Sequence, residues 1–491
     1  VKRATIFDGA VKYMVTGRSV YEYKSPASRQ LITEDKPGES LEPFHVWIGL
    51  DVNPRIKSFD NFVFYFDWKY DADKENYLSL LPLIKWYFNS EEIKSFAGFL
   101  QEDSTGVRIK SITEQYDNSL RAEKIVTKYF NGNFITLHAD ESNEIQPHLQ
   151  RTPAEFDNIF PLNVLDKIEG KCAWLKLVFP GAMKLSALND LYLSINSFPV
   201  INRRVNKITY QLRSNLNIVP LKTDEIFFDM IGVQNSDGNS FQFNPLESGF
   251  KNEAGYYTLR YGGIERFDKR EATEFLRTTI DLLRDESASF SSLGNEFIFS
   301  YINQINTAIA MIENRLGSSG ELIKPSHFLI VNPFKQNENI FIKFWSTSGS
   351  GGNQVKAGTK LTLSSGAVAR SASLMLLTTS AGGKKALNEN EKITAFKRSI
   401  LTHDRLVTQE DIINFCYHEL NNLVSKIEIR KNWHKSVLPR EGMIRILEVH
   451  ITPKQLNKIA EEEWQDIAKE LRLKIENSSG NLIPVKVIVH N

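Results

Sequence analysis

The alternation of apolar and polar residues is the clearest pattern in the first part of the chain. It predicts strands at residues 44–50 and 62–68. In the second of these, Phe62, Phe64, Phe66 and Trp68 share one face, because successive side chains of a strand point to opposite sides of a sheet. This aromatic stripe predicts the core of a sheet. A platform for stacking nucleic-acid bases would need interleaved basic residues, which the stripe lacks.

A long apolar stripe at helical spacing lies between residues 297 and 312. Its members recur four residues apart with no charge among them, which predicts a helix. Two interpretations stay open: the helix packs on its own domain, or it binds a partner. On the second interpretation, the candidate contact residues are Ile298, Ile302, Ile305 and Ile309.

A second helix is predicted at residues 408–420. The Thr408 hydroxyl can cap its N-terminus, and Asp411 can reach back to form a capping box with Asp in place of Glu. An apolar stripe follows, formed by Ile412, Phe415, Cys416 and Leu420.

The remaining C-terminal residues predict strands at 424–430 and 443–451. A helix is predicted to open at Thr452-Pro453, and a final strand at 484–490. This α-β-β-α-β order favours a small α+β sandwich. Upstream, the Gly/Ser-rich residues 346–353 predict a flexible loop.

These patterns predict an α+β protein of several domains. The expected division is a β-rich domain at 1–165, a β-rich middle domain at 166–262, a helical segment at 263–320, a β-rich insertion at 321–377, and a C-terminal α+β domain at 378–491.

The composition argues against several classes of function. The 491 residues carry 60 Lys and Arg against 59 Asp and Glu, a formal net charge of +1, which argues against a general nucleic-acid binder. A near-zero net charge protects a protein poorly against association, which suits a subunit of an assembly. The two cysteines, Cys172 and Cys416, exclude a disulfide framework and a multi-cysteine zinc site. No apolar run approaches the ~20 residues that span a bilayer, so no direct membrane insertion is expected.

Motifs of common enzymes are absent from the sequence: it has no P-loop, no GxGxxG after a strand, no HExxH and no GxSxG. His403 lies beside Asp404, and Cys416 lies two residues from His418, so neither pair is placed to work together on one helix face. We therefore expect no catalytic residues, no metal and no cofactor. A β-rich enzyme such as a carbohydrate-active protein stays open as an alternative of a different class.

Two segments resemble known families. Residues 395–420, AFKRSILTHDRLVTQEDIINFCYHEL, are similar to the "RDRxVTxEDF" segment of baseplate J-like proteins, and residues 378–391 resemble the "TxGGxDxES" segment that precedes it. Residues 196–203, NSFPVINR, resemble the "NCTPVVNLF" segment of TssF, a baseplate protein of the type VI secretion system. Within residues 196–203, Pro199 fixes its own φ and favours an extended residue before it, while Asn196 and Asn202 can tie down backbone at either end.

The resemblance implies a TssF-type wedge protein in a cytoplasmic baseplate docked near the inner membrane. Its implied partners are a TssG-like wedge protein, a second copy of this chain, TssK-like and TssE-like subunits, and the spike hub. Two copies in different positions would require a hinge, for which the polar linkers near Gly317 and Ser346 are candidates. The alternative within this class is a wedge protein of a contractile phage tail or an extracellular injection particle.

Arg398 and Arg405 lie just before the predicted helix, where the helix dipole disfavours positive charge. Acidic partners would explain them, either Glu410 and Asp411 or carboxylates of a neighbouring subunit. Solvated arginines are an equally open interpretation. The candidate subunit-contact residues here are Arg398, Arg405, Thr408, Glu410 and Asp411.

Overall fold

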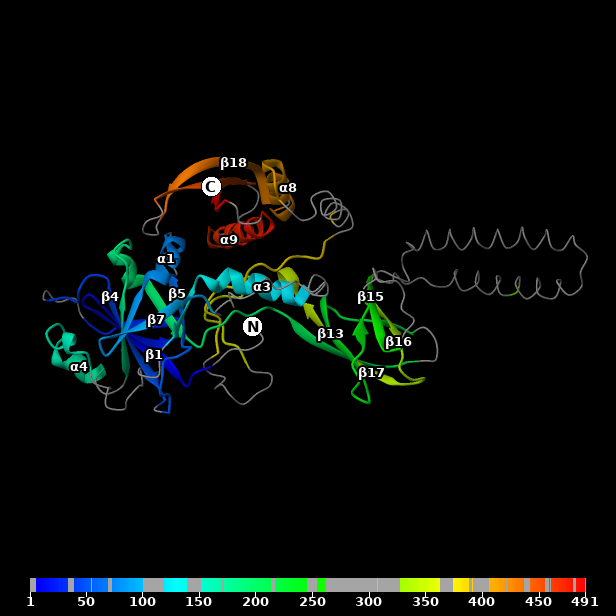
Figure 1. Cartoon of the computed structure of the whole chain (residues 1–491), viewed down its shortest axis with the longest axis horizontal. Coiled ribbons are helices and arrows are strands. Elements are labelled where there is room, and N and C mark those ends of the chain that lie inside the picture. Colours follow the sequence, from blue (N-terminus) through cyan, green and yellow to red (C-terminus); the bar gives the residue numbers. More distant parts are fainter. Residues whose placement is uncertain are drawn as a thin grey trace, which may run out of the picture. The chain divides into compact units, whose positions relative to one another are not determined.

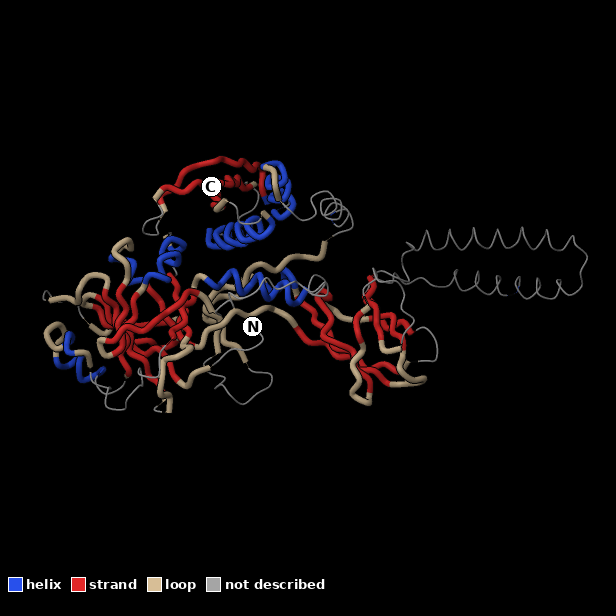
Figure 2. Tube along the Cα trace, in the orientation of Figure 1, coloured by secondary structure: helices blue, strands red, loops and turns tan. Residues whose placement is uncertain are grey.

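The computed structural model describes most of the chain in separate stretches. The described residues are 6–33, 39–53, 55–68, 73–99, 118–138, 152–168, 172–212, 217–244, 254–261, 307, 327–362, 374–387, 391, 406–420, 423–436, 442–454, 459, 461–479 and 483–490. They divide into two compact units: unit 1 comprises Val1–Asn202 and Ser348–Asn491, and unit 2 comprises Arg203–Thr347. Strands dominate both, which confirms the expectation of a β-rich, multi-sheet protein (Figures 1 and 2).

Unit 1 contains a curled ten-stranded sheet with the order β10-β5-β8-β7-β6-β9-β4-β1-β2-β3, a half-barrel in which every neighbouring pair is antiparallel. Its strands are β1 (Gly9–Thr16), β2 (Ser19–Ser25), β3 (Ser28–Leu31), β4 (His45–Val52), β5 (Val63–Trp68), β6 (Lys85–Phe88), β7 (Glu91–Ala97), β8 (Phe134–His138), β9 (Ala173–Val178) and β10 (Leu191–Ile195).

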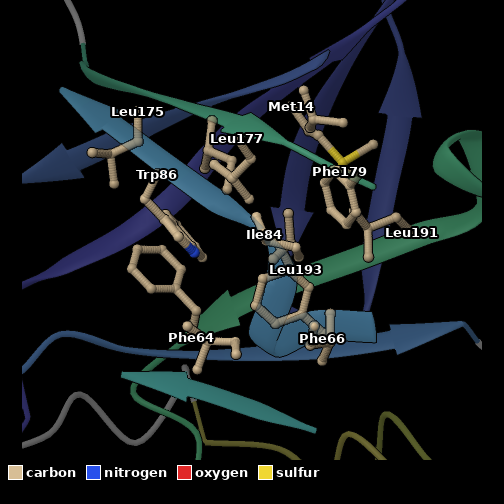
Figure 3. Close-up of a cluster of buried hydrophobic side chains, with 14 of the residues drawn as sticks. Met14, Phe64, Phe66, Ile84, Trp86, Leu175, Leu177, Phe179, Leu191 and Leu193 are labelled. Carbon is tan, nitrogen blue, oxygen red and sulfur yellow. The ribbon is translucent and has the colours of Figure 1, made fainter. Parts of the chain in front are cut away.

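The concave side of this sheet holds an aromatic core (Figure 3). Phe64 and Phe66 of β5 point toward Trp86 of β6, with ring centroids 4.8 and 6.1 Å from it. Leu175 and Leu177 of β9 close the cluster, and all five side chains are fully buried. The predicted aromatic stripe is thus sheet core.

The opposite side of β1, β4 and β9 is covered by short helical segments. Phe156 and Val164 pack there against Tyr13 and Trp174. The segments on this side are η3 (Ala154–Phe156) and α4 (Leu162–Ile168). Three others, α1 (Lys74–Leu80), η1 (Leu81–Leu83) and η4 (Leu185–Asp190), contribute side chains to the aromatic core, and α3 (Asn118–Asn131) precedes β8.

Unit 2 contains two small sheets that share one core. The first is antiparallel with the order β11-β17-β13, and the second has the order β12-β16-β15-β14. Buried residues of both, such as Ile342 and Val331, belong to one cluster. The strands are β11 (Arg204–Gln211), β12 (Asn217–Pro220), β13 (Ile226–Asn235), β14 (Gln242–Phe243), β15 (Tyr256–Tyr261), β16 (His327–Asn332) and β17 (Asn339–Thr347).

The C-terminal part of unit 1 is a three-stranded sheet with the order β18-β19-β20, packed against two helices. β18 and β19 are antiparallel, whereas β19 and β20 are parallel and are connected through the longer helix. The elements are α8 (Gln409–Leu420), β18 (Val424–Lys435), β19 (Met443–Pro453), α9 (Glu461–Ser478) and β20 (Val485–Val489).

Two local predictions are wrong. Thr452 and Pro453 do not begin a helix, since they end β19, where Pro453 pairs with Val424. Residues 346–353 are not a flexible loop: Ser346 is buried in β17, and Gly349–Gly352 forms the 3₁₀ helix η6. The division into five domains stays a prediction. The predicted helical stripe with Ile298, Ile302, Ile305 and Ile309 lies outside the described residues.

Candidate functional site

The candidate site consists of two segments that resemble baseplate proteins and a turn that both of them contact. The first segment is residues 196–203, and the second is residues 378–391. We define this turn as residues 348–355. The chain leaves unit 1 after Asn202 and re-enters it at Ser348, so the turn lies where the chain returns. Its contacts come from side chains far apart in sequence.

The first segment is anchored at both ends by asparagine side chains. Asn196 adopts a left-handed φ of 59°. Its side-chain oxygen accepts from the Phe7 N–H at 2.8 Å, and its amide donates to the carbonyls of Phe7 at 2.8 Å and Gly9 at 3.1 Å. Asn202 donates from Nδ2 to the Ser348 hydroxyl at 2.8 Å. Asn196 thus binds backbone groups, as predicted, whereas Asn202 binds a side-chain hydroxyl.

Between these anchors the segment presents apolar side chains to the surface. Pro199 is buried, whereas Phe198 and Val200 on either side of it are exposed. Because the backbone is held at Asn196 and Asn202, these two side chains are displayed in a fixed geometry.

The second segment meets the other side of the same turn. The Gln354 N–H donates to the Ser380 carbonyl at 2.8 Å, and the Ser380 N–H donates to the Val355 carbonyl at 3.0 Å. The Ser380 hydroxyl donates to the Gly352 carbonyl at 2.7 Å. The two resembling segments, separated by about 180 residues of sequence, therefore contact one turn.

Asn353 and Gly383 form the tightest part of this arrangement. The Asn353 side chain donates to the Gly383 carbonyl at 2.9 Å and accepts from the Gly383 N–H at 2.8 Å, as a neighbouring strand would. A Cβ at Gly383 would lie 2.8 Å from the carbonyl carbon of Gly349, so glycine is required there by close backbone approach.

The predicted capping box of α8 is present. The Thr408 hydroxyl accepts from the Asp411 N–H at 3.1 Å. The Asp411 carboxylate accepts from the N–H groups of Thr408 at 2.8 Å and Val407 at 3.2 Å, and these bonds, that from Thr408 foremost, lower the pKa of Asp411. Val407 is 82% exposed beside the cap. A role for Thr408, Glu410 and Asp411 in subunit contact stays a prediction, and Arg398 and Arg405 lie outside the described residues.

Sequence reasoning missed a partly buried charge cluster behind this helix. Glu419 of α8 accepts from Lys384 at 2.6 Å and from Lys474 of α9 at 2.8 Å. Burial opposes ionisation of Glu419, but the two ammonium groups outweigh it and lower its pKa to about 2. The cluster ties the segment after Gly383 to both helices. Charge alternation along the sequence gives no signal for it, because its members are 35 and 55 residues apart.

The thiol of Cys416 is not an activated nucleophile. Cys416 is fully buried, and that burial raises the pKa of its thiol to about 12, so it carries no thiolate at neutral pH. A cavity bounded by Tyr65, Asp67 and Tyr192 has a volume of only about 10 Å³, enough for a single water. No group of three or more potential metal ligands occurs among the residues described, and none of the described helices is long and apolar enough to cross a membrane.

Comparison with protein-family models and with curated proteins yields no match. Among solved structures, the chain is weakly similar to a chain in the cryo-electron microscopy structure of a type VI secretion system TssK–TssF–TssG baseplate subcomplex. The TM-score is 0.31 and the identity 11%, and the similarity covers 96% of this chain and 84% of the other.

Proposed function

We propose that the chain is a structural wedge subunit in the baseplate of a contractile injection machine of the type VI secretion kind, similar to TssF. The observation that carries this proposal is the shared contact of the two resembling segments. Asn202 of the first and Ser380 and Gly383 of the second all bind the turn at 348–355. Two chance matches to a family would have no reason to meet in space, whereas two parts of one scaffold would.

The kind of chemistry at this site also favours a structural role. Its interactions are backbone pairs and short amide or hydroxyl bonds, which fix geometry. Exposed apolar side chains occur in the same segment as Asn202, at Phe198 and Val200, and beside the cap of α8, at Val407. A rigid backbone that presents apolar side chains suits contact with another subunit.

The proposed partners follow from the same resemblance. They are a TssG-like wedge protein, a second copy of this chain, TssK-like and TssE-like subunits, and the spike hub, all in a cytoplasmic baseplate. The second copy would occupy a different position from the first. The packed turn at 348–355 makes a hinge within it unfavourable, so we place the required flexibility elsewhere in the chain.

Co-expression tests this proposal. The chain is produced with a TssG-type partner, and the mass of the purified complex is measured under native conditions. We expect two copies of this chain with one partner. An Asn353→Ala variant, which loses both bonds to Gly383, should give less complex, whereas Asn189→Ala, at an exposed position of unit 1, should match the unmodified chain. A chain that stays monomeric beside the partner, or that turns over a polysaccharide, would refute the proposal.

A further inference from the structure

The hairpin of β18 and β19 continues beyond the core that its first half helps to form. Near α8, Ile427 lies opposite Ile451 and Lys431 opposite Leu447, and three of these four side chains are buried among the helices. β20 pairs with β19 only from Leu447 onward. The far half of the hairpin is therefore two-stranded in the part of the chain that is described, and it runs away from α8 (Figure 1).

The face that is apolar core in the first half becomes aromatic and basic in the second. Trp433 lies opposite Arg445, and Lys435 lies opposite Met443, and directly opposite residues share a face. With Lys431 on the same side, this face holds three cations around two large side chains. Trp433 is 62% exposed and Met443 60% exposed. We call these five residues the hairpin patch.

The charge of this hairpin is strongly one-sided. Between residues 430 and 446 the sequence has Arg430, Lys431, Lys435, Arg440 and Arg445 against one acid, Glu441, although the whole chain is balanced. Arg430 contacts Glu428 at 2.8 Å, but the cations of the hairpin patch have no carboxylate within salt-bridge distance in the described structure. A surface of this charge favours an acidic ligand.

The edge of the sheet identifies the class of ligand. β18 is the first strand in the order β18-β19-β20, so no strand lies beside its outer edge among the described residues. Two of its N–H groups have side-chain partners: Ile427 donates to the Tyr417 hydroxyl at 3.2 Å, and Trp433 donates to Asn432 Oδ1 at 2.8 Å. An added strand would take the place of the Asn432 side chain. Only a polypeptide can satisfy a row of edge N–H and C=O groups by adding a strand. Lysines alone could serve to protect an edge from pairing, but an exposed Trp between two of them adds a large contact area, and Trp is the side chain most typical of binding hot spots.

We propose that the hairpin patch is a docking site for an acidic, extended segment of a partner protein, which adds to the edge of β18 and packs on Trp433. The carboxylates of the segment pair with Lys431, Lys435 and Arg445, and its apolar side chains contact Trp433 and Met443. This inference does not depend on the baseplate proposal, because it uses only the geometry and charge of the hairpin.

The test measures binding of the full-length chain to a fluorescently labelled peptide of alternating Glu and Val, about as long as β18, by fluorescence anisotropy. We expect saturable binding that weakens with added salt. Trp433→Ala should weaken it by about tenfold or more, Trp433→Phe should restore part of it, and the double variant Lys431→Glu/Arg445→Glu should abolish it. A peptide of alternating Lys and Val should not bind, and neither should the Glu-Val peptide with alternate backbone nitrogens methylated, because it cannot form the strand ladder.

The matched control reverses two charges elsewhere. Lys207 and Lys343 are an exposed cross-strand pair in unit 2, so Lys207→Glu/Lys343→Glu changes the net charge by the same amount. Its affinity should stay within about twofold of the unmodified chain. Absence of saturable binding, an equal loss in this control, or binding of the methylated peptide would overturn the proposal. Tighter binding of a single-stranded oligonucleotide, lost in Trp433→Ala, would overturn it in favour of nucleic acid.

Discussion

Gly383→Ala should loosen the turn at 348–355 without unfolding the rest of unit 1. The added methyl group would lie 2.8 Å from the Gly349 carbonyl carbon and 2.7 Å from Asn353 Oδ1, where about 3.5–4 Å is the favourable separation for carbon atoms. One neighbour is backbone, so the strain cannot be relieved by turning a side chain. Overpacking of this kind costs about 1–3 kcal/mol.

The surroundings decide where in that range the effect falls. Asn353 and Gly383 are half-buried, so the segments can move apart toward solvent, which favours the lower half of the range. Separation also weakens the two bonds between Asn353 and Gly383, each worth about 0.5–1.5 kcal/mol. Together these effects predict a loss of about 2 kcal/mol, which is expressed first as local opening.

Hydrogen exchange measures this opening directly. The amides of Gln354 and Ser380, which pair across the turn, should exchange about thirtyfold faster in Gly383→Ala. Gly132→Ala is the control, because a Cβ at Gly132 meets no atom within 4 Å and Gly132 also belongs to unit 1. If both variants leave these two amides as protected as in the unmodified chain, the close-packing argument is wrong.

Three further predictions concern other parts of unit 1. Thr408→Ala should lower the free energy of unfolding by about 0.5–2 kcal/mol, whereas Thr408→Ser should keep most of the stability that the cap contributes, as measured by urea unfolding. An equal loss in both variants would contradict the role of the hydroxyl. Since the folded pKa of Glu419 is depressed to about 2, its contribution to stability is present above its ordinary pKa near 4.5 and is lost as the pH falls from there toward 2. Glu419→Gln should therefore flatten the dependence of unfolding free energy on pH in this range, and an unchanged dependence would contradict the prediction. Asn196→Ala should release the chain at Phe7 and speed proteolysis there, while Asn196→Asp, which keeps the acceptor and tolerance of positive φ, should have a smaller effect; equal cleavage of all three forms would contradict it.

Local patterns predicted individual elements well. The aromatic residues of β5 lie on the expected face because the period of two is a property of the strand itself. The Thr408 cap formed as predicted, because its partners are within three residues. Tyr65 shows the limit of this reasoning: it is also buried, on the other face of β5, because Phe99 and Phe134 pack with it there.

The features that the sequence did not indicate depend on distant partners. The order of the ten-stranded sheet, in which β10 pairs with β5 and β9 with β4, is set by contacts over more than a hundred residues. Thr452 and Pro453 carry the composition of a helix start, but at the end of β19 the missing proline N–H costs no ladder bond, so the strand tolerates it. Glycines at 349–352 suggested mobility, yet Gly349 is buried and packed against the segment that contains Gly383.

The bond between Asn202 and Ser348 has a consequence for synthesis on the ribosome. Unit 2 is one uninterrupted stretch, so it can fold as it emerges, while unit 1 is completed only when the residues that follow Ser348 have been made. Bringing Asn202 to Ser348 across an unfolded intervening chain of this length would cost on the order of 4 kcal/mol in loop entropy. Once β11 has paired with β17, beginning at Arg204 opposite Ser346, the two ends already lie side by side. Early folding of unit 2 thus removes most of the entropic barrier to completing unit 1. A short peptide that joins Asn202 to Ser348 could then replace unit 2 altogether.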